Sequence, residues 1–307
     1  MAGKYISERK PTLTVFTPAY NRAHTIELCY KSLLRQTSND FKWLIIDDGS
    51  TDSTGNLVRS WIEENKIPIQ YYYQENQGMH GAHNAAYRLI DTELNVCIDS
   101  DDYLADNAVE LIVNKWRNEG SDKYAGIIAL DAKFDGTVIG TFFDISHTTL
   151  SGFYMRGGNG DKKLVYRTSV LKSVPEYPLF EGEKYVGLGY KYQLIDLKYE
   201  LLTMNEVLCY VDYQADGSSI NMYKQYFRNP RGFSFIRKES MKHHPSYKRR
   251  FIEAVHYVSS SIICHNSKFI LESPRKLITI LAIPFGVMLY LWLSFQYKRN
   301  KSMTLNS

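Results

Sequence analysis

Residues 94–102 read Leu-Asn-Val-Cys-Ile-Asp-Ser-Asp-Asp, a short apolar run followed at once by three carboxylates. The run Leu94–Ile98 predicts a buried strand, because short apolar runs that end in a polar turn are typical of such strands. The charges of Asp99, Asp101 and Asp102 repel one another unless a cation or hydrogen-bond donors offset them. Carboxylate oxygens suit a hard divalent cation. An acidic turn that only caps the next helix would contain the same residues, so both interpretations stay open.

A second acidic cluster, Asp47–Asp52, follows another apolar run. Gly49 suits the turn, and Thr51 or Asp52 suits the N-cap of a following helix. A carboxylate at a strand end is also placed to bind a ligand. A structural role for Asp52 and a binding role for Asp48 are therefore compatible.

Strands and helices alternate through the first part of the chain. Apolar runs predict strands at 13–17, 41–46, 67–73, 94–98 and 124–130. Helical spacing predicts helices at 24–36, from about 51, at 79–91 and at about 106–118. This alternation predicts an α/β fold on a mostly parallel sheet, which binds ligands outside the carboxyl ends of its strands. Farther along, the polar, Gly-rich residues 151–163 predict a loop, and 201–211 predict a late strand.

The composition excludes several classes of protein. Of the 307 residues, 44% are hydrophobic, which is ample for a core and too many for a disordered chain. A net charge of +4 is too small to indicate a nucleic-acid partner. The four cysteines are far apart, which argues against zinc and against a disulfide framework. The N-terminal residues lack an apolar stretch of signal-peptide length, so we expect the bulk of the chain in a reducing cytosol.

The composition changes toward the C-terminus. Residues 222–250 contain nine Lys or Arg and one acid, and we expect helices there and over 251–270. Leu277–Phe295 has 19 residues without a charge; as a helix it would extend roughly 28 Å, close to the ~30 Å hydrocarbon core of a bilayer. We expect this segment to insert into a membrane, with the basic stretch beside anionic lipid. Pro284 and Gly286 leave open whether it spans the bilayer or turns back as a hairpin.

Four motifs occur in a defined order: Thr17–Arg22, Asp47–Asp52, Asn76-Gln77-Gly78 with His83-Asn84, and Asp99–Asp102. Together they resemble glycosyltransferase family 2, whose members have the GT-A fold, over roughly residues 10–215. The resemblance implies an inverting transferase that uses a nucleotide-diphospho-sugar, with a UDP-sugar expected, and a divalent cation, Mn²⁺ or Mg²⁺. The subgroup that it resembles contains bacterial surface-polysaccharide transferases.

The resemblance also implies roles for individual residues. Pro18 and Tyr20 would line the pocket for the base and the ribose, and Asp48 would read the base. Asp99 would contact the ribose or the metal, and Asp101 would be the principal metal ligand.

Gly78 and His83, from the third motif, complete the donor-binding set that the resemblance implies. Many family members carry Arg where His83 stands. His is a weaker partner for a diphosphate than Arg, because its charge depends on pH. His80 is near enough in sequence to compensate, although it would equally suit a polar helix surface.

An inverting transfer needs a base, because the acceptor hydroxyl must lose its proton to a group within hydrogen-bond reach. The run Glu181-Gly182-Glu183-Lys184 lies where the family keeps its acidic pair. We expect Glu183 to be the base, with Glu181 as the second candidate. An exposed acidic loop without a catalytic role would have the same sequence.

The sequence thus predicts a GT-A domain over 10–215, a basic helical extension over 216–272 and an apolar membrane segment with a basic tail over 273–307. The expected function is sugar transfer to a membrane-linked glycan or polyprenol-linked acceptor, by a cytoplasmic catalytic domain attached to the membrane. One alternative is a sugar nucleotidyltransferase, which would want a Gly-rich phosphate loop after the first strand. Another is a non-catalytic, membrane-attached glycan or nucleotide binder, which would not need Glu183 or both acidic clusters.

Overall fold

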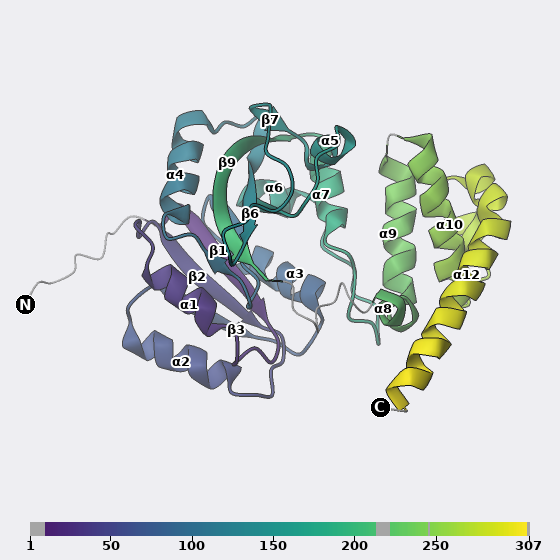
Figure 1. The fold of residues 1–307 in the computed structure, drawn as a ribbon, viewed down its shortest axis with the longest axis horizontal. Helices are drawn as coiled ribbons and strands as arrows, with labels where there is room; N and C mark the ends of the chain where they lie inside the picture. The colour runs from purple at the N-terminus through teal and green to yellow at the C-terminus, as the bar shows by residue number, and fades with distance from the viewer. Residues whose placement is uncertain (1–9, 213–221, 245, 306–307) are drawn as a thin grey trace, which may run out of the picture. The chain divides into compact units, whose positions relative to one another are not determined.

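The computed structural model describes residues 10–212, 222–244 and 246–305. They form two compact units, both drawn in Figure 1. The first unit contains the chain up to residue 76, residues 82–176 and residues 195–212. The second contains residues 77–81, residues 177–194 and the C-terminal helices. The predicted boundary between residues 215 and 216 lies outside the described residues.

Four parallel strands form one half of the sheet in the first unit. They are β1 (Leu13–Ala19), β2 (Phe41–Asp47), β3 (Ile69–Tyr73) and β4 (Leu94–Cys97), in the spatial order β3-β2-β1-β4. The helices that alternate with them along the chain are α1 (Glu27–Leu34), α2 (Thr54–Glu64), α3 (Met79–Leu89) and α4 (Ala108–Glu119). The predicted alternation of strands and helices is therefore confirmed.

The other half of the sheet is mixed. β8 (Lys162–Arg167) is antiparallel to both β4 and β6 (Tyr124–Lys133). β9 (Glu200–Val211) is parallel to β6 and antiparallel to two short strands, β5 (Tyr103–Leu104) and β7 (His147–Thr148). The expectation of a mostly parallel sheet thus holds for the first four strands and for the pair β6–β9, whereas β8, β5 and β7 are antiparallel to their neighbours. Antiparallel neighbours need no helical crossover and leave no alternation in the sequence.

The predicted loop over 151–163 is wrong at both ends. Helix α5 (Leu150–Met155) lies at its start, where the Thr149 Oγ1 accepts a hydrogen bond from the Gly152 N at 2.9 Å. Such a cap satisfies an amide that has no helical partner. β8 begins at the other end, and two further short helices, α6 (Thr168–Ser173) and α7 (Gly189–Asp196), were not predicted.

Aromatic rings fix α1 and α2 against β2 in the core of the first unit. Trp43, Tyr30 and Trp61 stack on one another, with ring centroids 4.3 to 6.2 Å apart. The Trp43 Nε1 also donates a hydrogen bond to the Thr17 Oγ1 of β1 at 2.9 Å, so its polar atom is satisfied. This packing holds the ends of β1 and β2 in place.

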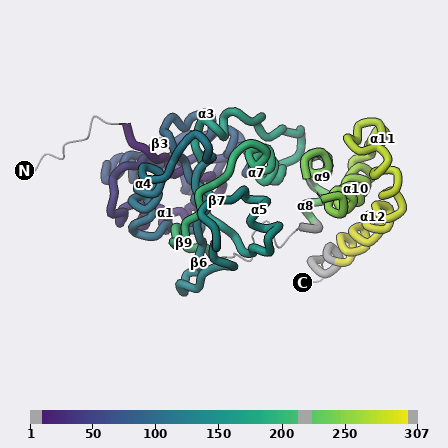
Figure 2. The backbone as a smooth tube through the Cα atoms, turned by 90° about the horizontal axis from the view of Figure 1, so that it is seen from above, coloured from purple at the N-terminus to yellow at the C-terminus, as the bar shows by residue number. Residues whose placement is uncertain are grey.

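The second unit ends in five helices, shown in green to yellow in Figure 2. They are α8 (Met222–Arg228), α9 (Pro230–His243), α10 (Tyr247–Ile263), α11 (Phe269–Glu272) and α12 (Lys276–Leu305). Both α9 and α12 pack along α10. The helices predicted over 222–250 and 251–270 are therefore confirmed, although they are divided into shorter pieces.

Helix α12 continues without a break through Pro284 and Gly286, so the hairpin that the sequence left open is wrong. Gly286 allows close packing on α10, because a Cβ at this position would lie 2.5 Å from the Val258 Cβ. The opposite face of α12 is exposed and apolar. It includes Leu277, Leu281, Phe285, Met288, Leu291, Trp292 and Phe295. By length and composition alone, Lys276–Arg299 would suffice to cross a membrane.

Candidate active site

Three strand ends meet at one edge of the sheet in the first unit. β1 lies between β2 and β4, with Ala19 opposite Asp47 and Phe16 opposite Cys97. The Asp48 N donates a hydrogen bond to the Ala19 O at 2.8 Å, which continues the pairing beyond β2. The two acidic clusters therefore follow the strands on either side of β1, at the edge where open α/β sheets bind ligands.

Asn21 ties the loop after β1 to the loop after β2. Its φ of 53° is left-handed, a conformation that Asn adopts more readily than most residues. The Asn21 Oδ1 accepts a hydrogen bond from the Thr51 N at 2.8 Å, and its own N donates to the Ser50 Oγ at 2.9 Å. Pro18 is buried in β1, whereas Tyr20 is 49% exposed beside the joined loops. Of these two predicted pocket residues, only Tyr20 presents a ring that a ligand could cover.

The two carboxylates that close β2 have different partners. Asp47 is buried; its Oδ1 accepts from the Ser50 N at 2.8 Å and its Oδ2 from the Tyr71 hydroxyl at 2.5 Å. Burial, and then the bond to Asp47, raises the pKa of Tyr71 well above its usual value. Asp48 is also buried, and its Oδ1 accepts from the Gln74 Nε2 at 2.7 Å. Asp47 therefore builds the turn, and Asp48 is the candidate for ligand binding.

The thiol of Cys29, in α1, contacts the backbone of the acidic turn Asp99–Asp102. Its Sγ lies 3.2 Å from the Asp99 O and 3.1 Å from the Asp102 O. Burial, followed by the charge of nearby acidic groups, raises the pKa of Cys29 well above its usual value, so the thiol keeps its proton and donates. No pattern in the sequence indicates this contact, because Cys29 and the acidic turn are about seventy residues apart.

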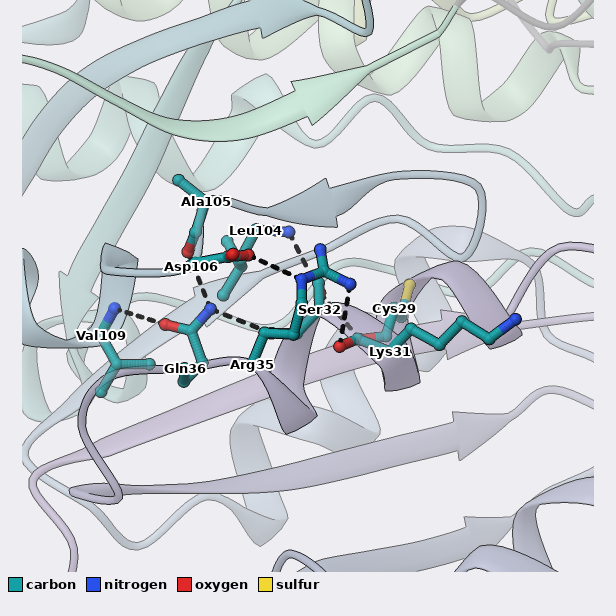
Figure 3. Close-up of polar contacts among 9 residues, drawn as sticks. All are labelled: Cys29, Lys31, Ser32, Arg35, Gln36, Leu104, Ala105, Asp106 and Val109. Carbon is teal, nitrogen blue, oxygen red and sulfur yellow. Dashed lines mark hydrogen bonds and ion pairs between the residues drawn. The ribbon is translucent and has the colours of Figure 1, made fainter.

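Further contacts from α1 hold the segment after the acidic turn (Figure 3). The Ser32 Oγ accepts a hydrogen bond from the Leu104 N at 3.3 Å, and the Gln36 Nε2 donates to the Ala105 O at 2.8 Å. These bonds satisfy one backbone group within β5 and one directly after it. The acidic turn is thus fixed through its flanking backbone.

The three carboxylates of the acidic turn differ in exposure. Asp99 is exposed, Asp101 is half-buried and Asp102 is buried. Burial raises the pKa of Asp102 to about 8, with Asp99 and Asp101 adding to this effect and Lys163 opposing it. Asp99 and Asp101 are therefore the two carboxylates of this turn that are not fully buried.

Lys163 is a buried cation of the same unit that the sequence did not reveal. Its Nζ lies 3.8 Å from the Asp131 Oδ1, and both side chains are largely buried. Burial alone would lower the pKa of Lys163, but the charges of Asp131 and of the acidic turn raise it well above its usual value. The lysine therefore offsets part of the negative charge at this end of the sheet. Sequence reasoning missed it because Lys163 falls within the stretch 151–163 that was expected to be a loop.

Asp99 and Asp101 fit a hard divalent cation that is completed by a ligand. In the described part of the chain, no group of three or more His, Cys, Asp or Glu side chains is arranged to hold a metal ion. Mg²⁺ is usually held by one or two carboxylates together with substrate phosphates and water. The two carboxylates that follow β4 match that donor set without a third protein ligand.

His83 is buried between α3 and the sheet. Its ring makes an edge-on contact with Phe16, with centroids 5.1 Å apart, and its Nδ1 lies 3.0 Å from the Tyr87 hydroxyl. Its Nε2 is 3.8 Å from the Cys97 Sγ. These contacts give His83 a packing role, and its contact with a diphosphate stays a prediction.

In the second unit, Glu183 anchors the start of α9. Its Oε1 accepts hydrogen bonds from the backbone N and the Nε of Arg231, each at 3.0 Å, and its Oε2 accepts from the Gly232 N at 2.8 Å. Negative charge is favourable at a helix N-terminus, where the first amides have no helical partner. Glu181 is exposed, and its carboxylate has no hydrogen-bonding or ion-pairing partner among the described residues. The two candidate bases thus differ in their contacts: the carboxylate of Glu183 is hydrogen-bonded at the start of α9, and that of Glu181 is exposed.

Gly78 brings the third motif against this acidic loop. It has a φ of +79°, and a Cβ at this position would lie 2.1 Å from the Lys184 O, so only glycine fits. His80 is 1% exposed, and neither ring nitrogen has a hydrogen-bond partner among the described residues. Burial, and then the charge of Lys184, lowers the pKa of His80 to about 4. His80 is therefore neutral at pH 7 in this structure, and its compensation for His83 stays a prediction.

Comparisons with known proteins agree with this architecture. A sequence model described as glycosyl transferase family 2 matches residues 14–139. Chondroitin synthase of Escherichia coli is 36% identical over 112 residues, which are 36% of this chain and 16% of that protein. Teichoic acid poly(glycerol phosphate) polymerase of Staphylococcus epidermidis is 32% identical over 107 residues, which are 34% of this chain and 15% of that protein. The chain therefore corresponds to only a small part of these relatives.

Solved structures show a similar fold over most of the chain. TarS 1–349 of S. aureus, in complex with UDP-GlcNAc, has a TM-score of 0.60 at 18% identity, covering 90% of this chain and 80% of that one. The mannosyltransferase PcManGT of Pyrobaculum calidifontis, in complex with GDP-Man and Mn²⁺, has a TM-score of 0.55 at 16% identity, covering 97% and 81%. The family match itself contains β1 to β4 and both acidic clusters. The chain therefore carries a domain of glycosyltransferase family 2 with the GT-A fold.

Proposed function

We propose that the protein is a glycosyltransferase that moves a sugar from a nucleotide-diphospho-sugar to an acceptor hydroxyl, with inversion at the anomeric carbon. The observation that carries the proposal is the placement of Asp48 and of the acidic turn Asp99–Asp102 after two strands that flank β1. Membership of the matched segment in a glycosyltransferase family supports the same reaction.

The donor is a UDP-sugar in this proposal. Asp48 accepts from an N–H of the uracil edge, which suits a carboxylate at the end of β2. Pro18 and Tyr20 line the base and ribose site, and the exposed ring of Tyr20 provides a flat face for the nucleotide. Gly78 and His83 belong to the same donor-binding set. Relatives of this fold have been solved with UDP-GlcNAc or with GDP-Man, which supports a nucleotide-sugar without fixing its base.

The leaving group is a nucleoside diphosphate, and its negative charge grows as the glycosidic bond breaks. Asp101, with Asp99, would hold a divalent cation, Mn²⁺ or Mg²⁺, that neutralises this charge. The contribution of the chain is to keep these two carboxylates charged and in place. The thiol of Cys29 holds the backbone of the turn, and the charge of Lys163 lowers the repulsion among its carboxylates.

The base is a carboxylate of the loop Glu181–Lys184. A carboxylate that acts as the base must lose its own hydrogen bonds before it can accept the proton of the acceptor hydroxyl. Both oxygens of Glu183 are bonded at the start of α9, whereas the carboxylate of Glu181 is exposed. These contacts favour Glu181 as the proton acceptor and make Glu183 the residue that positions the loop, which reverses the order that the sequence suggested.

The acceptor is a glycan or lipid attached to a membrane, in surface-polysaccharide assembly, with the catalytic domain on the cytoplasmic side. The support for this part is α12, whose exposed face is apolar along its length. Because the other face packs on α10, we propose that α12 lies in the membrane surface with one side in the lipid. A carbonate wash of membranes tests the attachment: the full chain should stay with the lipid, and a chain that ends before α12 should be released.

A donor screen tests the reaction itself. UDP-, GDP- and dTDP-sugars are incubated with the protein, with and without Mn²⁺, and the release of nucleoside diphosphate is measured. The proposal predicts metal-dependent release from a UDP-sugar. A nucleotidyltransferase would instead form pyrophosphate from a nucleoside triphosphate and a sugar phosphate, and a non-catalytic binder would give neither product.

A further inference from the structure

Gln74 comes directly after β3, at the same edge of the sheet at which Asp48 follows β2. β2 and β3 are neighbouring parallel strands, with Asp47 opposite Tyr73. The Gln74 N donates a hydrogen bond to the Asp47 O at 2.9 Å, which extends the pairing one residue beyond β3. The side chains of Asp48 and Gln74 therefore come from adjacent strand ends, at the edge where open α/β sheets bind ligands.

The amide of Gln74 is held against the carboxylate of Asp48. Its Nε2 donates a hydrogen bond to the Asp48 Oδ1 at 2.7 Å. An ionised carboxylate only accepts hydrogen bonds, so this contact fixes which end of the amide faces Asp48. Asp48 is buried and Gln74 is half-buried, which restricts both side chains. A hydrogen-bond acceptor and a donor are thus fixed side by side.

The backbone keeps these two strand ends together. A Cβ at Gly49, the residue after Asp48, would lie 2.8 Å from the Asn76 N, so the turn after β2 packs directly on the segment after β3. A larger residue at Gly49 would push the two segments apart. A pair of polar groups that is fixed before a ligand arrives costs little to order on binding.

Gln74 has hydrogen-bonding capacity beyond its contact with Asp48. Its side chain makes one hydrogen bond among the described residues, and its NH₂ group has two hydrogens. The second hydrogen of Nε2 is therefore a donor for a ligand. Asp48 can accept a further bond as well, because each carboxylate oxygen has more than one lone pair. The pair suits a ligand that carries a donor next to an acceptor.

Uracil carries this pattern on one edge. Its N3–H would donate to Asp48, and its neighbouring O4 would accept from the Gln74 Nε2. Cytosine carries the reverse pattern, a lone pair on N3 and an amino group on C4. Its lone pair would face the carboxylate and its amino group the amide hydrogen. A site built on hydrogen bonds rejects an analogue that leaves its polar groups unpaired.

We infer that Gln74 reads the nucleobase together with Asp48, by donating to the O4 of uracil. Gln74 lies outside the four motifs by which the sequence resembles its family, so its role follows from its contact with Asp48. The inference rests on the proposed function in one respect, that the donor carries a uracil nucleotide. It adds a residue that determines which base is accepted.

The test measures the affinity of the full-length protein for UDP and for CDP by calorimetry in the presence of Mn²⁺. The two nucleotides share the ribose and the diphosphate, so the ratio of their Kd values depends on the base alone. Gln74→Met keeps the length of the side chain without its polar atoms, and Gln74→Glu replaces the donor by an acceptor. The matched control is Gln70→Glu, the same substitution at another half-buried position of β3. A half-buried side chain with one hydrogen bond should tolerate these changes without loss of the fold.

The wild type should prefer UDP to CDP, and the control should bind both nucleotides like the wild type. Both Gln74 variants should bind UDP about tenfold or more weakly, because O4 loses its donor. Gln74→Glu should bind CDP more tightly than Gln74→Met does, because its carboxylate accepts from the amino group of cytosine. A residue that only held Asp48 in place would not produce this difference.

Three results would overturn the inference: unchanged UDP affinity in Gln74→Met, equal CDP affinity of the two Gln74 variants, or a wild type that binds UDP and CDP alike. If the affinities change as expected but the wild type releases no UDP from a UDP-sugar, the proposed function alone is wrong.

Discussion

One oxygen of the Glu183 carboxylate, Oε1, accepts two hydrogen bonds from Arg231. One comes from the backbone N of Arg231 and the other from its Nε, each at 3.0 Å. Its second oxygen is bonded to the next backbone amide at 2.8 Å. The Glu183 carboxylate thus caps the first amides of helix α9, whereas the carboxylate of Glu181, two residues earlier, is exposed. Two glutamates that look alike in sequence therefore have different chemistry.

Glu183→Gln should lower the free energy of unfolding by about 1–3 kcal/mol, because the amide has no charge and cannot accept all three bonds. Urea denaturation at neutral pH measures this change. Glu181→Gln is the matched control and should leave stability unchanged. Equal stability of the two variants would show that the Glu183 cap contributes nothing.

Glu181→Gln should lower the transfer rate by about 10²–10⁴, with donor affinity retained, because the amide cannot take up the acceptor proton. The rate is measured at a temperature at which the wild type and both glutamine variants are folded. If Glu181→Gln is fully active and Glu183→Gln is not, Glu183 is the base, as the sequence suggested. If both are active, the base lies outside this loop.

Lys163→Met should destabilise the protein by about 3–5 kcal/mol, since it leaves the buried carboxylate of Asp131 without its cation. Asp131→Asn in the same chain should restore part of that loss. The measurement is a double-mutant cycle in urea, with the single and double variants compared at one pH. Additive effects of the two substitutions would mean that the 3.8 Å pair is not an energetic unit.

Through His80, lowering the pH from 7 to 5 should reduce the stability of the folded protein by about 2 kcal/mol. The pKa of His80 is lowered to about 4 in the folded protein, against about 6.5 in the unfolded chain. Between these values the unfolded chain binds a proton that the folded protein does not, so acid favours unfolding.

His80→Gln, which does not titrate, tests this assignment. Denaturation of the wild type and the variant at pH 7 and pH 5 should show that this drop in pH changes the stability of the variant more favourably than that of the wild type, by about 2 kcal/mol. The raised pKa of Asp102 acts alike in both proteins. The pKa of His256 is also lowered to about 4, mainly by burial, but His256 is present in both proteins and its contribution cancels. The same pH effect in both proteins would contradict the assignment to His80.

The sequence predicted the features whose cause is local. The strands β1 to β4 follow from apolar runs, and Gly49 is at the expected turn, with a φ of +84° and a Cβ position 2.8 Å from the Asn76 N. Both acidic clusters lie at strand ends, as the alternation of strands and helices implied. These signals depend on neighbours within a few residues, so a single sequence contains them.

Features that depend on distant segments were missed. In the sequence Lys163 looks like a loop residue, because its partner, the buried Asp131, lies on another strand. The role of Glu183 depends on the start of α9, 48 residues later, and that of Cys29 on the acidic turn. The sequence shows which polar and charged groups are present, but which of them pair with one another is seen only in the folded structure.

The central claim is that Asp101, at the end of β4, supports a metal-dependent glycosyl transfer. The most direct measurement titrates Mn²⁺ into the wild type and into Asp101→Asn, and records metal binding by electron paramagnetic resonance together with UDP release from a UDP-sugar. We predict that the variant loses Mn²⁺ affinity and about 10³-fold in rate, because charge stabilisation at the leaving diphosphate is worth several kcal/mol. Wild-type metal binding and a wild-type rate in the variant, or an undiminished wild-type rate in excess EDTA, would contradict the claim.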